Sequence, residues 1–227
     1  MRKNNFFLFL LIIVSNFLFN CGKNSGVKRK SLSVDYYKMS LLELEGEHVG
    51  VASYRRALQF VNRALEQRVV SRYVAHKATL LFLLGAHDES LSFFRKALSL
   101  SKSASVRSEI LNNYACLLAS GGDKKGALKL FIQLEHDKHY LTPEVAVVNQ
   151  ARLYCDEGEW GRARGKLVYA TKLAPNYVDA FYYLGLVCYA LKEYDAALCS
   201  IERTVSLEPA HRGAKELLSR LKRRAIQ

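Results

Sequence analysis

Two stretches near the end of this 227-residue chain repeat one pattern of small and apolar residues at an interval of 34 positions. The corresponding pairs are Ala151 and Gly185, Tyr154 and Cys188, Ala163 and Ala197, Leu167 and Ile201, Ala170 and Thr204, and Pro175 and Pro209. At helical spacing each stretch gives two short helices, whose small residues let the two backbones approach closely. Because one hairpin of this size cannot bury its apolar faces alone, the pattern predicts a stack of hairpins.

This arrangement resembles the tetratricopeptide repeat family, whose repeat has the same period and layout. The resemblance implies an all-α fold, a right-handed superhelical solenoid of about five helix-turn-helix repeats with a C-terminal capping helix. The repeats are expected at 38–70, 71–107, 108–143, 144–177 and 178–211, with a basic capping helix at 212–227. The first is the least regular, the second is expected to end in a lengthened serine-rich loop, and the third has a lengthened exit.

The N-terminus has the layout of an export signal. Arg2 and Lys3 precede an apolar run over 6–19, which is too short for an ordinary membrane-spanning helix, and Cys21 follows. This order resembles the bacterial lipoprotein signal, which implies a signal peptide at 1–20, lipidation of Cys21, and a position in the bacterial cell envelope, with the periplasmic side favoured over the cell surface. An uncleaved N-terminal anchor and a free secreted form are the alternatives. The polar, basic segment 21–37 is predicted to be a flexible tether.

The formal net charge of +13 favours anionic partners. An exported chain rarely meets nucleic acid, so lipid headgroups and acidic proteins are the expected anions. The predicted capping helix is a candidate basic patch for either of them, or else a solvated cap. Its basic residues are Arg212, Lys215, Arg220, Lys222, Arg223 and Arg224.

No enzyme signature is present, and the chain is predicted not to be an enzyme. Gly121 and Gly122 lie in a turn between helices and lack the strand that a phosphate-binding loop requires. His136 and His139 lack further metal ligands, so no cofactor, metal or small-molecule substrate is expected. Beyond Cys21 the chain has four cysteines at different repeat positions, which favours structural packing and leaves any disulfide pairing open: Cys116, Cys155, Cys188 and Cys199.

In the family that the chain resembles, the first helices of successive repeats line a concave groove. By this resemblance the candidate groove residues are Phe82, Asn112, Cys116, Val145, Val148, Arg152, Tyr182, Leu186 and Tyr189. Towards the C-terminus this lining is apolar and aromatic, which suits a helical or extended peptide. The expected function is a membrane-tethered scaffold that binds another envelope protein or peptide, for example in envelope or pilus assembly. The alternatives are a surface-exposed lipoprotein that engages host ligands and an adaptor of a cell-wall enzyme.

Overall fold

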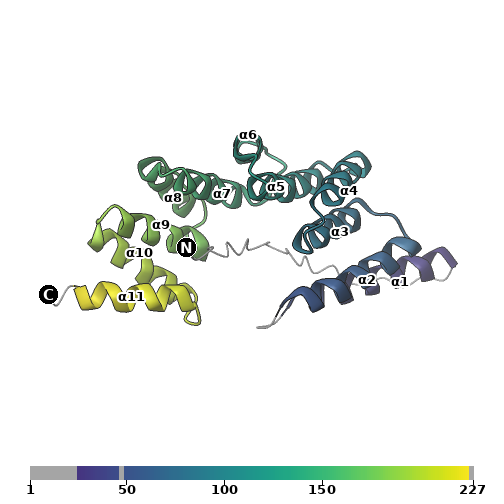
Figure 1. Ribbon diagram of the computed structural model, residues 1–227, viewed down its shortest axis with the longest axis horizontal. Helices are drawn as coiled ribbons and strands as arrows, with labels where there is room; N and C mark the ends of the chain where they lie inside the picture. Colours follow the sequence, from purple (N-terminus) through teal and green to yellow (C-terminus); the bar gives the residue numbers. More distant parts are fainter. Residues whose placement is uncertain (1–24, 46–48, 225–227) are drawn as a thin grey trace. The chain divides into compact units, whose positions relative to one another are not determined.

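The computed structural model of the protein describes residues 25–45 and 49–224, and within these ranges it contains eleven α-helices and no β-strand (Figure 1). The helices are α1 (Ser25–Leu42), α2 (Val51–Gln67), α3 (Ser71–Leu83), α4 (His87–Leu100), α5 (Ala104–Ser120), α6 (Lys124–Glu135), α7 (Pro143–Asp156), α8 (Trp160–Leu173), α9 (Val178–Ala190), α10 (Tyr194–Leu207) and α11 (Arg212–Arg224). The all-α prediction is therefore confirmed. The chain divides into two compact units, Met1–Gly121 and Gly122–Gln227, called unit 1 and unit 2 below.

Unit 1 is built from helical hairpins. α1 packs on α2, α3 packs on α4, and α5 packs on both α3 and α4. Small residues on α2, including Ala57 and Ala64, are fully buried beside Val61, so the helices cross closely there. In the second hairpin Phe94 fills the space beside Ala78. Each hairpin buries its apolar side against the next, as stacked repeats require.

The first helix differs from the predicted tether. Residues 21–37 were expected to be flexible, yet the described part from Ser25 onward is helical, and α1 begins ahead of the first predicted repeat, 38–70. Ser33 and Ser40, seven residues apart and therefore on one face, are both fully buried. The Tyr37 ring stacks on Tyr73 of α3 at 4.4 Å. Small serines replace the alanines of the other hairpins, so a hydrophobic pattern does not identify this face.

The lengthened segment between the second and third predicted repeats also differs from expectation. α4 ends at Leu100 and α5 already begins at Ala104, so the inserted residues extend a helix instead of a loop. The Ser103 hydroxyl accepts a hydrogen bond from the Val106 amide at 3.5 Å and caps this longer helix. The lengthened exit at 136–142 does form a loop, and Pro143 opens α7.

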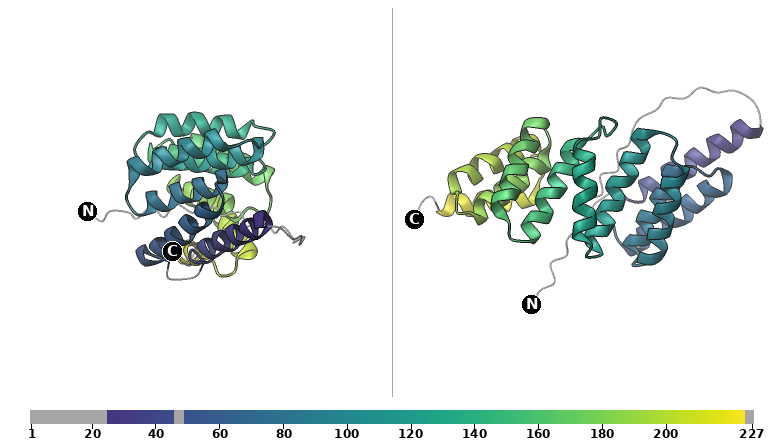
Figure 2. Two further views of the ribbon diagram at one scale, coloured as in Figure 1. Left: turned by 90° about the vertical axis from the view of Figure 1, so that its right-hand side faces the viewer. Right: turned by 90° about the horizontal axis from the view of Figure 1, so that it is seen from above.

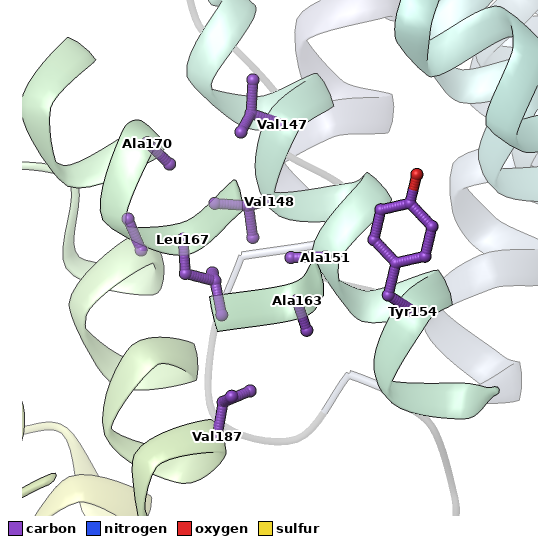
Figure 3. Packing of buried hydrophobic residues seen from close by; sticks show 9 residues of the cluster. Val147, Val148, Ala151, Tyr154, Ala163, Leu167, Ala170 and Val187 are labelled. Carbon is purple, nitrogen blue, oxygen red and sulfur yellow. The ribbon is translucent and has the colours of Figure 1, made fainter. Parts of the chain in front are cut away.

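Unit 2 stacks its helices in chain order, coloured green to yellow in Figure 2. α7 pairs with α8 and α9 pairs with α10, while α6 packs on α7 and α11 packs on α10. The core of α7, α8 and α9 is made of small and aliphatic side chains directed at one another, among them Val148, Ala151, Leu167 and Val187 (Figure 3). At the C-terminal end Leu217 and Leu221 of α11 seal the core of α9 and α10.

Four turns between consecutive helices share a left-handed residue. Gly85, Gly122 and Gly158 have φ of +85°, +93° and +75°, and Lys192 has φ of +63° in the equivalent turn between α9 and α10. Glycine adopts this conformation without the steric cost that a side chain adds. At the equivalent turn, Lys192 carries a side chain in a backbone conformation that favours glycine, so this turn is strained.

The close approach of helices at Gly185 is confirmed. A Cβ atom built at this glycine would lie 2.6 Å from Cδ1 of Ile201, well inside van der Waals contact. Ile201 is fully buried in α10. The absence of a side chain at Gly185 thus sets how closely α9 and α10 pack.

Candidate functional site

The nine residues predicted to line a groove lie in both units and differ in exposure. The buried ones are Asn112, Cys116, Val145 and Val148. The partly exposed ones are Phe82, Arg152, Tyr182, Leu186 and Tyr189. Val148 belongs to the core between α7 and α8 (Figure 3), so its side chain packs helices together instead of offering a contact surface.

In unit 1 the first helices are joined by a salt bridge. The Arg72 guanidinium of α3 donates to both carboxylate oxygens of Glu109 of α5, at 2.9 and 3.3 Å. Phe82, further along α3, contacts the His87 ring edge-on at a centroid distance of 5.1 Å. Phe82 is the single partly exposed member of the predicted set in this unit. Unit 2 is therefore the stronger candidate for a binding surface.

In unit 2 a continuous series of ring contacts crosses the first helices of successive hairpins. The guanidinium of Arg152 on α7 lies 5.2 Å from the ring centroid of Tyr183 on α9. The ring centroids of Tyr183 and Tyr182 are 5.6 Å apart, and those of Tyr182 and His211, which lies just before α11, are 4.4 Å apart. We call these four residues the tyrosine strip. A guanidinium over an aromatic face is attractive, and tyrosine combines apolar area with a hydroxyl, so the strip can offer both kinds of contact.

Two further tyrosine contacts extend this region along α9. The ring of Tyr189 meets Tyr194 of α10 edge-on at 5.7 Å, and the guanidinium of Arg224 lies 4.1 Å from the centroid of Tyr194. Tyr189 and Leu186 are partly exposed and pack on the core that α11 closes. The aromatic side chains are thus held in place by packing before any partner binds.

The tyrosine hydroxyls of this region stay protonated at neutral pH. Burial raises the pKa of Tyr183, which the nearby charge of Arg152 partly offsets. Burial and then the charge of Glu216 raise the pKa of Tyr182. Burial also raises the pKa of Tyr177, whose hydroxyl donates to Asp179 at 3.2 Å. The hydroxyls of Tyr182 and Tyr183 are therefore neutral groups that can donate a hydrogen bond to a ligand, whereas Tyr177 already donates its hydrogen to Asp179.

His211 fixes the junction between the strip and α11. Its Nδ1 atom accepts a hydrogen bond from the Ala214 amide at 3.1 Å, so the imidazole caps the first turn of the helix. A Cβ atom on Gly213 would lie 2.5 Å from the Tyr182 hydroxyl oxygen. Gly213 therefore makes room for Tyr182 at this junction.

The six residues of the predicted basic patch all lie on α11 and all are exposed. One of them is paired within the helix, because Arg220 donates to Glu216 at 2.9 Å. Arg223 donates through Nε to the Ser219 carbonyl oxygen at 3.2 Å. The patch is therefore a solvent-facing surface on the outside of the C-terminal helix.

Cys21 and the predicted signal peptide lie outside the described residues, so lipidation of Cys21 stays a prediction. Burial, with a further contribution from the charge of Asp156, raises the pKa of the Cys155 thiol to about 11. Burial also raises the pKa of Cys188. A thiol held in its protonated form is a poor nucleophile, so these two side chains are suited to packing and not to redox chemistry.

Within residues 25–45 and 49–224, no three histidine, cysteine, aspartate or glutamate side chains come together as a metal site. His136 and His139 both lie in the loop at 136–142 that leads to α7. No helix in these same ranges has the length and apolar character needed to cross a bilayer.

Sequence reasoning did not identify Tyr183, Tyr194 or His211, each of which joins two elements of the site. These residues lie beside the repeat positions that were considered, where side chains contact the neighbouring helix. The run Tyr182-Tyr183 was the available signal, since two adjacent aromatics on a packed helix face different neighbours.

Residues 148–210 match a family model described as tetratricopeptide repeat. No curated protein sequence matches the chain. Among solved structures, PilW, described as a widely conserved type IV pilus biogenesis factor, is similar with a TM-score of 0.65 and 19% identity over 85% of this chain and 91% of its own. Pseudomonas aeruginosa pilF is similar with a TM-score of 0.67 and 17% identity, over 86% and 85% of the two chains. YrrB, described as having an unusual peptide-binding site, has a TM-score of 0.50 and 19% identity over 85% and 97%.

Proposed function

We propose that this chain, whose residues 148–210 match the tetratricopeptide repeat model, is a membrane-tethered scaffold. Its tyrosine strip binds a segment of another envelope protein. Repeat proteins of this kind are generally interaction scaffolds, and the proposal gives the chain no catalytic role. The observation that carries it is the series of ring contacts from Arg152 through Tyr183 and Tyr182 to His211.

Three properties of this region support peptide binding. Tyrosine and arginine are the residue types that most often dominate binding energy at interfaces. The rings are already held by neighbouring side chains, so less conformational entropy is lost when a partner binds. The partly exposed Leu186 and Tyr189 continue the apolar surface along α9.

The membrane tether is proposed from the N-terminal sequence. A basic start, an apolar run and Cys21 have the order of a lipoprotein signal. A single acyl chain holds a protein to a bilayer only weakly, whereas two or more bind it stably. The pilus role described for PilW motivates an envelope location, although a likeness at this identity is one of fold.

Site-specific photocrosslinking in cells tests the binding surface. A photoreactive amino acid at Tyr189 is expected to give a discrete crosslink to one protein. The same group at Tyr169, an exposed position on α8, is the matched control and should give none. Leu186→Glu should abolish the crosslink, because it places a charge in the apolar surface. A crosslink that survives Leu186→Glu, or that forms equally at Tyr169, would exclude this surface.

Fatty-acid labelling tests the tether. Wild type is expected to take up the label and to sediment with membranes, and Cys21→Ser should lose the label. A variant that keeps the label would show that lipid is not attached at Cys21.

A further inference from the structure

We propose that the outward face of α11 binds anionic lipid bilayers by charge alone, independently of the tyrosine strip and of any lipid at Cys21. The basis is the charge distribution in unit 2 and the helical register of α11.

The excess of positive over negative charge in unit 2 comes from α11. This helix has six basic residues and one acidic residue, whereas the rest of unit 2 has eleven basic and twelve acidic residues. Charge that gathers on one short helix creates a local field that is lost when the same charges are spread over a surface. The charge of α11 therefore differs from that of the rest of unit 2, in which basic and acidic residues nearly balance.

The register of α11 places four of these charges together. Successive residues in an α-helix are about 100° apart, so Arg212, Lys215, Lys222 and Arg223 share an arc of about 100°. Ala214, Leu217 and Leu221, which are buried, lie on the opposite side. We call the four cations the basic stripe. Core packing on one side thus fixes the direction in which the basic stripe points.

The basic stripe has no acidic partner among the residues that the structure describes. The single acidic residue of α11, Glu216, is paired with Arg220, which lies outside the stripe. The sixth cation, Arg224, is placed against Tyr194. All four side chains of the stripe are exposed, so their charges are available to a partner.

The composition of this face favours a bilayer over a protein. Protein interfaces are usually centred on buried aromatic or apolar anchors. Within residues 25–45 and 49–224, the exposed large apolar side chains all lie outside α11. A bilayer surface needs no such anchor, because juxtamembrane lysines and arginines are attracted to anionic headgroups without burying apolar area.

Vesicle partitioning of the full chain tests the proposal. Wild type is compared with a quadruple variant, Arg212→Gln, Lys215→Gln, Lys222→Gln and Arg223→Gln, on phosphatidylcholine vesicles with and without phosphatidylglycerol. For each protein, the partition coefficient on vesicles with phosphatidylglycerol is divided by that on vesicles without it, which gives the preference for anionic headgroups. The apolar N-terminal segment is the same in both proteins, so a difference between their two ratios reports the effect of headgroup charge. Each cation near an anionic surface contributes roughly fivefold, so the quadruple variant should lose about a hundredfold or more of the wild-type preference.

A second variant removes the same charge elsewhere in unit 2. The four exposed lysines chosen for it are Lys125, Lys138, Lys172 and Lys192, each replaced by Gln. This control should keep most of the preference for anionic vesicles. Added salt should reduce the preference of wild type and leave the quadruple variant nearly unchanged.

Two outcomes would overturn the proposal. One is equal partitioning of wild type and the quadruple variant on anionic vesicles, or an equal loss in the control variant. The other is binding to polyglutamate that depends on the basic stripe while vesicle partitioning does not, which would indicate an acidic protein partner instead. Neither outcome bears on crosslinking at Tyr189, so this inference and the proposed function fail separately.

Discussion

Acidification is expected to destabilise unit 1 through the buried imidazole of His76. Its Nε2 atom lies 2.9 Å from the Ser40 hydroxyl, which in turn donates to the Ala57 carbonyl oxygen at 2.7 Å. A hydroxyl has one hydrogen to donate, so the short Ser40–His76 contact assigns the donated proton to Nε2 of the ring. The chain of bonds joins α3, α1 and α2 while the imidazole is neutral.

The size of the effect follows from the pKa of this group. Burial lowers the pKa of His76 from 6.5 to about 4. Above pH 6.5 the imidazole is neutral in both the folded and the unfolded chain, so the pKa difference costs nothing there. Below pH 6.5 the unfolded chain gains the proton first, so stability falls until the folded pKa is reached. The loss by about pH 4 is roughly 3 kcal/mol, a large part of the stability of a small domain.

Denaturant unfolding followed by circular dichroism over this pH range measures the loss. His76→Gln removes the titrating group and should flatten the curve of unfolding free energy against pH. His87→Gln is the matched control, since His87 is exposed on the neighbouring α4, and it should leave the curve of wild type unchanged. Equal losses of free energy in wild type and His76→Gln between pH 6.5 and about pH 4 would refute the reasoning.

Three further substitutions have calculable effects on stability in thermal or denaturant unfolding. Gly185→Ala should destabilise the protein by about 1–2 kcal/mol, because the new methyl group overlaps Ile201. Adding Ile201→Val should recover part of this loss, whereas no loss in the single variant would mean that α9 and α10 separate freely. Lys192→Gly should stabilise by about 1 kcal/mol, because it relieves a left-handed backbone, and a destabilised variant would contradict that reading. Lys166→Met should cost about 2 kcal/mol, because the Glu135 carboxylate, with 6% of its side chain exposed, loses its cation at 2.7 Å; a neutral result would show that the pair adds nothing.

The hairpins that were predicted well are those whose packing uses alanine, glycine and branched aliphatic residues. In α7 to α10, residues such as Ala163 and Ala197 recur at the period of the repeat and are all buried. The first hairpin could not be read in the same way, because Ser33 and Ser40 take the small-residue positions in α1. A buried serine that bonds its own helix or a neighbouring carbonyl has no hydrophobic signal in the sequence.

The candidate site was predicted from positions in the repeat, and the side-chain contacts in the structure changed which residues belong to it. Repeat positions correctly located α9 as a helix with partly exposed aromatics, including Tyr182 and Tyr189. They could not separate Val148, which faces the core, from residues that face solvent, since a shift of a few tens of degrees about a helix decides which way a side chain points. The membrane tether and the identity of a partner depend on residues and molecules beyond the helices described.

The terminal helix α11 combines two roles, closing the core with Leu217 and Leu221 and giving unit 2 its net positive charge. A premature stop codon after His211 would therefore expose Ile201 and its neighbours to water and reverse the sign of the net charge of the unit at the same time. A loss of function in a truncated allele could therefore come either from misfolding or from the loss of electrostatic attraction. Only point replacements that keep the leucines can distinguish the two in a genetic screen.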